Sequence, residues 1–122
     1  MIMNKDNLYR RINKFFEDHT FVFESNFLYN PDPAFNAEIE FKFKIVGEVD
    51  KIRIGELTTY VLVDVGILKT NNKILKMFLD ENLPTEKFLQ FRMNLENYLY
   101  KKLDVFDIRH ILIHDIKWVG DD

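Results

Sequence analysis

Two histidines near the carboxyl end are the first candidates for metal chemistry. His110 and His114 bracket the apolar segment Ile111-Leu112-Ile113. On a helix, histidines at this spacing could hold one zinc ion. The segment is rich in β-branched residues and predicts a strand, on which the two side chains stand about 13 Å apart along the chain. One ion cannot bridge that distance, so we predict a pair of edge or interface histidines without a catalytic role, and no metal.

A second candidate lies in Pro31-Asp32 and Glu40-Phe41-Lys42. Glu40 and Lys42 are two residues apart on an expected strand, so both side chains point to one face while Phe41 enters the core. These residues resemble the P-D…(D/E)-x-K signature of the restriction-endonuclease-like nucleases. The resemblance implies that Asp32 and Glu40 hold Mg²⁺ near the scissile phosphate and that Lys42 activates or orients water.

The sequence also departs from that nuclease family. Glu38 and Lys44 extend the charged row on the same strand, and any amphipathic strand with alternating charge contains E-x-K. A further strand over residues 57–65 stands between this motif and the next core helix, where the family passes directly to the helix. Gln90 is followed by Asn94, so the Q-x-x-x-Y of some branches is absent. We therefore keep a metal-dependent nuclease as the alternative to a non-catalytic function.

Composition excludes several other catalytic classes. The chain has no cysteine, which removes thiol nucleophiles, cysteine-ligated zinc and iron–sulfur clusters. Ser25 is the only serine, and Glu24 and Asn26 beside it do not form the G-x-S-x-G turn of serine hydrolases. The four glycines are too scattered for a phosphate-binding loop. Catalytic residue types are thus in short supply, and an enzyme is the less favoured interpretation.

Charge argues against general nucleic-acid binding. The chain has 17 basic and 20 acidic residues and a net charge of −3, whereas affinity for phosphate backbones comes from basic charge. Arg10, Arg11 and Lys14 form a local basic cluster on the expected first helix and give a second alternative, a nucleic-acid-binding module. Three charges on a helix more often form a solvated face.

The pattern along the chain predicts one α+β domain over residues 1–122. Helical spacing marks a first helix from an Asn4 or Asp6 cap, with an apolar face that includes Phe15. Period-two alternation then marks strands from Thr20, over residues 37–45 and over 57–65, with a possible short extension at residues 51–54. Residues 57–65 are apolar on both faces, which is typical of a central strand covered on both sides.

The second half predicts helices and a last strand. Asn71 or Asn72 caps a short helix, a main helix covers residues 85–103, and a strand covers 107–119. The element order is α-β-β-β-(α)-α-β, and we expect a mainly antiparallel sheet with helices packed on it. The final strand must add at an edge or insert beside the first. Within the central strand, Asp64 interrupts an apolar run, so we expect it to have a salt-bridge partner.

The main helix carries more apolar surface than one sheet face covers. At 100° per residue its apolar side chains sweep an arc of about 220°, twice the usual stripe. Arg92 and Glu96 lie within that arc and predict a partly buried i,i+4 ion pair. Tyrosine, methionine, arginine and tryptophan are enriched at interface cores and hot spots. The candidate protein-binding residues are Arg92, Glu96, Tyr98, Tyr100 and Trp118.

These observations predict a non-catalytic protein-binding domain that acts as an assembly component, subunit or inhibitor, through a protein partner or self-association. The element order is similar to that of small phage tail-completion proteins, which implies viral assembly, and less closely to double-stranded-RNA-binding domains. The chain contains no signal-peptide stretch and no run of about 20 apolar residues. We expect a cytoplasmic protein with no membrane partner and no cofactor.

Overall fold

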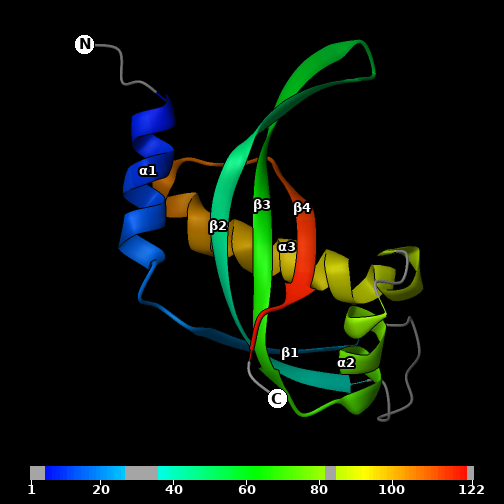
Figure 1. The fold of residues 1–122 in the computed structure, drawn as a ribbon. Helices are drawn as coiled ribbons and strands as arrows, with labels where there is room; N and C mark the ends of the chain where they lie inside the picture. The colour runs from blue at the N-terminus through cyan, green and yellow to red at the C-terminus, as the bar shows by residue number, and fades with distance from the viewer. Residues whose placement is uncertain (1–4, 27–35, 82–84, 121–122) are drawn as a thin grey trace.

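The computed structural model describes residues 5–26, 36–81 and 85–120. Helix α3 crosses one face of a four-stranded sheet, and α1 lies beside the sheet near β2 (Figure 1). The elements in chain order are α1 (Lys5–Phe16), β1 (Phe21–Asn26), β2 (Asn36–Arg53), β3 (Glu56–Thr70), α2 (Lys73–Asp80), the 3-10 turn η2 (Thr85–Phe88), α3 (Leu89–Leu103), the 3-10 turn η3 (Asp104–Phe106) and β4 (Ile111–Trp118). The predicted α+β class and element order are confirmed.

The sheet is mainly antiparallel, as the sequence predicted, but its last strand pairs in parallel, so the sheet as a whole is mixed. Its order is β1-β2-β3-β4. The β1–β2 and β2–β3 pairs are antiparallel, and the β3–β4 pair is parallel. Two parallel neighbours need a long crossover, and the segment holding α2 and α3 supplies it. The last strand therefore adds at the edge beside β3, one of the two positions that the sequence left open.

Strict alternation along β2 and β3 places the core on one face of the sheet. Every second residue is buried over residues 37–45 of β2 and 61–67 of β3, and α3 contributes one buried side chain per turn. The most deeply buried side chains are Phe41, Phe91, Ile12, Ile39, Ile67, Leu75, Leu95, Leu99, Leu103, Ile111 and Val63. The opposite face of β2 carries the row of alternating charges that the sequence indicated.

Helix α1 closes part of the outer edge of β2. The Asn13 side chain accepts a hydrogen bond from the Ile45 N–H at 2.8 Å and donates one to the Ile45 carbonyl at 2.9 Å. Phe16 is buried against Phe43 and Phe21. Phe15, which the sequence placed on the apolar face, is instead exposed at the rim of the helix.

Several predicted boundaries are wrong around the β2–β3 hairpin. Strand β2 does not stop near Gly47 but continues to Arg53, so residues 51–54 are not a separate extension. Strand β3 begins at Glu56, and Leu57 is exposed instead of buried in a central strand. Strand β3 is central, as predicted, but full burial on alternate residues from Val61 to Ile67 lies on one face, while Leu62 and Asp64 on the other face are only half-buried among the described residues.

Boundaries in the second half differ less. The Asn72 side chain accepts from the N–H groups of Ile74 and Leu75, which confirms the predicted cap of α2. The main helix begins as the 3-10 turn η2, so regular α-helix starts only at Leu89. Strand β4 begins at Ile111, because Asp107 adopts a left-handed conformation that ends η3.

The β2–β3 hairpin projects past both neighbouring strands (Figure 1). The last β2 residue paired with β1 is Phe41, and the first β3 residue paired with β4 is Val61. Beyond these points β2 and β3 pair only with each other, over the five residue pairs from Val49↔Tyr60 to Arg53↔Glu56. Residues 48–60 are called the arm below.

Candidate functional site

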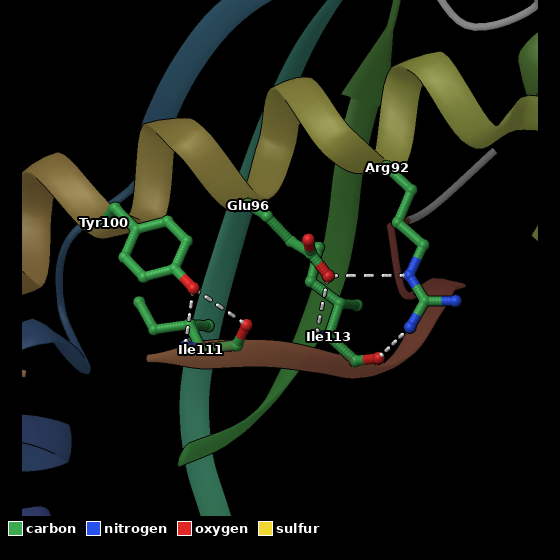
Figure 2. A network of polar contacts seen from close by, with 5 residues as sticks. All are labelled: Arg92, Glu96, Tyr100, Ile111 and Ile113. Atoms are coloured by element: carbon green, nitrogen blue, oxygen red, sulfur yellow. Dashed lines mark hydrogen bonds and ion pairs between the residues drawn. The ribbon is translucent and has the colours of Figure 1, made fainter. Parts of the chain in front are cut away.

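Three of the five residues that the sequence assigned to protein binding, Arg92, Glu96 and Tyr100, line the outer edge of β4 (Figure 2). The Tyr100 hydroxyl accepts a hydrogen bond from the Ile111 N–H at 3.0 Å and donates one to the Ile111 carbonyl at 3.3 Å. Both backbone groups would otherwise face outward with no strand beside them. Tyr100 therefore takes the place of a neighbouring strand at this position.

Arg92 and Glu96, which precede Tyr100 on α3, bond the outward backbone groups of Ile113, the next outward-facing residue of β4 (Figure 2). The Ile113 N–H donates to the Glu96 carboxylate at 3.3 Å, and the Arg92 guanidinium donates to the Ile113 carbonyl at 2.7 Å. Arg92 and Glu96 are 3.7 Å apart, with side chains 27% and 20% exposed, so the predicted partly buried ion pair is confirmed. One stripe of α3 thus closes the β4 edge.

Tyr98 and Trp118 also contact their own chain. The Tyr98 ring stacks on Phe23 at 5.1 Å between centroids and meets Phe41 edge-on at 5.5 Å. Trp118 packs at the border of the core with the Lys76 ammonium 5.1 Å from its ring centroid. In the part of the chain that the structure describes, its buried indole N–H has no hydrogen-bond acceptor. A role of these five residues in binding another protein stays a prediction.

The nuclease residues are placed only in part. Asp32 lies outside the described residues. Glu40 and Lys42 share the charged face of β2 as predicted, and the Lys42 ammonium donates to the Glu17 carbonyl at 3.0 Å just after α1. There it complements the negative end of the helix. Across the described ranges 5–26, 36–81 and 85–120, no three His, Asp or Glu side chains gather to hold a metal ion.

The two histidines have different surroundings. His110 precedes β4 and contacts the Tyr60 ring edge-on at 5.6 Å. His114 lies on β4, and its Nδ1 is 2.8 Å from the Asp64 carboxylate, which supplies the partner that the sequence predicted for Asp64. His114 is largely exposed on the face of the sheet opposite α3, so this pair joins β3 to β4 at the surface.

The basic cluster of α1 is solvent-facing. Arg10, Arg11 and Lys14 are all exposed, as a solvated helix face requires. Their neighbour Asn13 points the other way and closes the β2 edge. Nucleic-acid binding through this cluster stays a prediction.

The arm is the site that the sequence did not predict. Three large aliphatic side chains on it are exposed: Ile52 to 75%, Ile54 to 104% and Leu57 to 69%. Ile54 and Gly55 form its two-residue turn with φ values of +53° and +77°. The signal in the sequence was Gly55 between Ile52 and Leu57, a turn residue flanked by alternating apolar positions.

Polar contacts hold the arm in one shape. The Thr59 hydroxyl donates to the Asp50 carboxylate at 2.6 Å across the two strands. The Arg53 guanidinium donates to the Tyr60 hydroxyl at 3.1 Å, and this hydrogen bond raises the pKa of Arg53 above its ordinary value. At the base, the Tyr9 hydroxyl of α1 donates to Glu48 at 2.6 Å. The aliphatic side chains are therefore presented on a braced hairpin.

Comparison with known proteins adds no family. The chain matches no protein-family model, no curated protein and no solved structure. No described helix has the length and apolar character needed to span a membrane.

Proposed function

We propose that this protein is a non-catalytic protein-binding domain, an assembly component, subunit or inhibitor, and that it binds its partner through the arm. The observation that carries the proposal is Ile54, which is fully exposed at the tip in a left-handed conformation. A β-branched residue with positive φ costs about 1–2 kcal/mol relative to ordinary backbone. The fold gains no burial from Ile54 in return.

Binding of a partner would bury the exposed Ile54 side chain. Burying one isoleucine contributes about 1.5–3 kcal/mol to association, and Ile52 and Leu57 stand opposite each other on the same arm. Because the ladder and its polar cross-links already fix the arm, binding loses little conformational freedom. Exposed aliphatic groups on a rigid projection are typical of an interaction site.

A photo-crosslinking amino acid at position 54 tests the proposal in the protein's native cell. We expect a discrete adduct with one protein, either another copy or a different chain, and we expect Ile52→Asp to abolish it. The matched control carries the same group at Val105, which is 80% exposed but lies on η3 away from the arm. Equal products from both positions, or none from position 54, would contradict the proposal.

A further inference from the structure

The outward backbone groups of the arm follow from its register. In a hairpin with a two-residue turn, the flanking pair, here Arg53 and Glu56, exchanges hydrogen bonds, and bonded and non-bonded pairs then alternate along the ladder. Leu57 and Thr59 belong to non-bonded pairs, so their N–H and C=O groups point away from β2. The β3 edge of the arm therefore presents two outward amides.

Val61, the next alternate residue of β3 after Leu57 and Thr59, confirms that these backbone groups point away from β2. The Val61 N–H donates to the His110 carbonyl at 2.9 Å, on the side where β4 joins β3. Strand β4 begins only there, so its place beside the arm is open. Within the described residues no hydrogen bond reaches the outward backbone groups of Leu57 or Thr59.

This edge lacks the protection that the β4 edge and the β2 edge at Ile45 have. Side chains of α3 close β4 and Asn13 closes β2. The segment Leu57-Thr58-Thr59-Tyr60 contains no charge, no proline and no bulge, the devices that usually prevent an edge strand from pairing. It is instead rich in residues that favour strands.

We infer that a second copy of this chain pairs with this edge, antiparallel and two-fold symmetric about Thr58. The inference rests on the proposed function and names the partner of that site. A two-fold axis perpendicular to the sheet relates each strand to its copy, so the residue at the axis lies directly opposite the same residue of the other copy, with both side chains on one face. Centring on Thr58 sets Leu57 opposite Thr59 and Glu56 opposite Tyr60 of the other copy.

This register satisfies the backbone and the charges. Leu57 and Thr59 of the two copies exchange four hydrogen bonds, and the two Thr58 side chains meet as a favourable cross-strand pair. Each Glu56 comes beside the other copy's Tyr60, whose hydroxyl already holds the Arg53 guanidinium. No like charges oppose each other. The ladder ends at Tyr60, where β4 begins.

The other edge of the arm does not allow the same pairing. Centring two β2 strands on Asp50 or on Lys51 sets that charge directly against itself. Centring them on Val49 sets Glu48 opposite Asp50, and centring them on Ile52 sets Lys51 opposite Arg53, so like charges oppose each other in each of these registers, which is destabilising. The β2 edge therefore excludes self-pairing, while the β3 edge of the same arm accepts it. The β3 edge of the arm is thus complementary to a second copy of itself, and the β2 edge is not.

Disulfide trapping tests the register directly. The chain has no cysteine, so Thr58→Cys introduces a single thiol. At a non-bonded pair on the axis the two Cα atoms lie about 4.5 Å apart, within disulfide range. Lys51→Cys is the matched control, because Lys51 lies opposite Thr58 on the same arm but at the other edge. We expect rapid oxidation to a dimer for Thr58→Cys only; equal rates for both variants would overturn the inference.

A proline pair tests the edge without a new thiol. Leu57→Pro and Ile52→Pro each replace an exposed aliphatic residue of one cross-strand pair and each remove an outward N–H, on opposite edges. Light scattering over a concentration series, with circular dichroism to verify folding, should show self-association weakened at least about tenfold by Leu57→Pro and retained by Ile52→Pro.

The outcomes separate this inference from the proposed function. A wild-type chain that is monomeric at all concentrations, or two proline variants that behave alike, would overturn self-pairing. If crosslinking from position 54 then captures one different protein, the proposed function stands and only the second copy is excluded. If that crosslink is also absent, both proposals fall.

Discussion

The β4 edge and the β3 edge of the arm both present outward backbone groups, but only those of β4 are hydrogen-bonded within the described residues. At β4, the outward N–H and C=O groups of Ile111 and Ile113 are hydrogen-bonded by side chains of α3, so another strand cannot pair with β4 at these two residues. On the arm, the outward groups of Leu57 and Thr59 have no such cover among the described residues, and aliphatic side chains surround them. The comparison teaches that polar residues on an over-wide apolar helix can close a sheet edge within their own chain.

The largest expected effect comes from loosening the helix that closes β4. Leu95 has no exposed surface and lies on α3 between Arg92 and Glu96. Leu95→Ala should lower the free energy of unfolding by about 2–5 kcal/mol, because it leaves a cavity under the helix. Denaturant unfolding measures this. Asn97→Ala, at an exposed position of the same helix, should change it by less than about 0.5 kcal/mol; equal losses would contradict the placement of α3.

Removing one closing group should have a smaller effect. Tyr100→Phe keeps the ring but leaves the Ile111 N–H and carbonyl without their partner, so the loss should be about 1–3 kcal/mol. Hydrogen exchange at the Ile111 amide should accelerate. Tyr9→Phe is the matched control, because its hydroxyl bonds Glu48 at the exposed base of the arm. If the two variants lose the same stability, closure of the β4 edge has no special energetic weight.

On the arm the expected sign is reversed. Ile54→Asn places a residue that tolerates positive φ before Gly55, so the free energy of unfolding should rise by up to about 1 kcal/mol. The same change should weaken partner binding, because it removes the exposed aliphatic group. Ile52→Asn, at an ordinary strand position, should give no such gain. Urea unfolding of dilute protein checks both; destabilisation by Ile54→Asn would mean that Ile54 contributes to the fold.

The smallest effect is expected on the face of the sheet that none of the described helices covers. His114→Ala breaks the pair with Asp64, but His114 is 59% exposed, so the loss should be below about 1 kcal/mol. Thermal unfolding at low and high salt measures it. A loss above about 2 kcal/mol that depends on protein concentration would show that another chain covers this face.

The α+β fold could be predicted from local pattern wherever burial is one-sided. Alternation along residues 37–45 and the Asn72 cap are short-range effects, and both were predicted correctly. The extent of β2 was not, because Gly47 and alternating charges past it read as a loop. The ladder with β3 carries the strand to Arg53, and that pairing is not visible in either segment alone.

The candidate site divides in the same way. The ion pair of Arg92 and Glu96 follows from their spacing on a helix, and the sequence predicted it. That the pair faces β4 depends on where the crossover returns the chain, which no local pattern states. The arm projects as a free hairpin because β1 and β4 stop short of it, and no local pattern states where those neighbouring strands end.

By itself the sequence determined most of the residues that are buried on each element, the short stretch in which α2 is capped and the catalytic classes that lack the necessary side chains. These depend on residue type and on periods of two and 3.6 residues, which act over a few positions. Only the tertiary structure decided that β4 runs parallel to β3, that α3 closes one edge and that the arm leaves another open. These depend on which strands become neighbours, and that is settled by the packing of the whole chain.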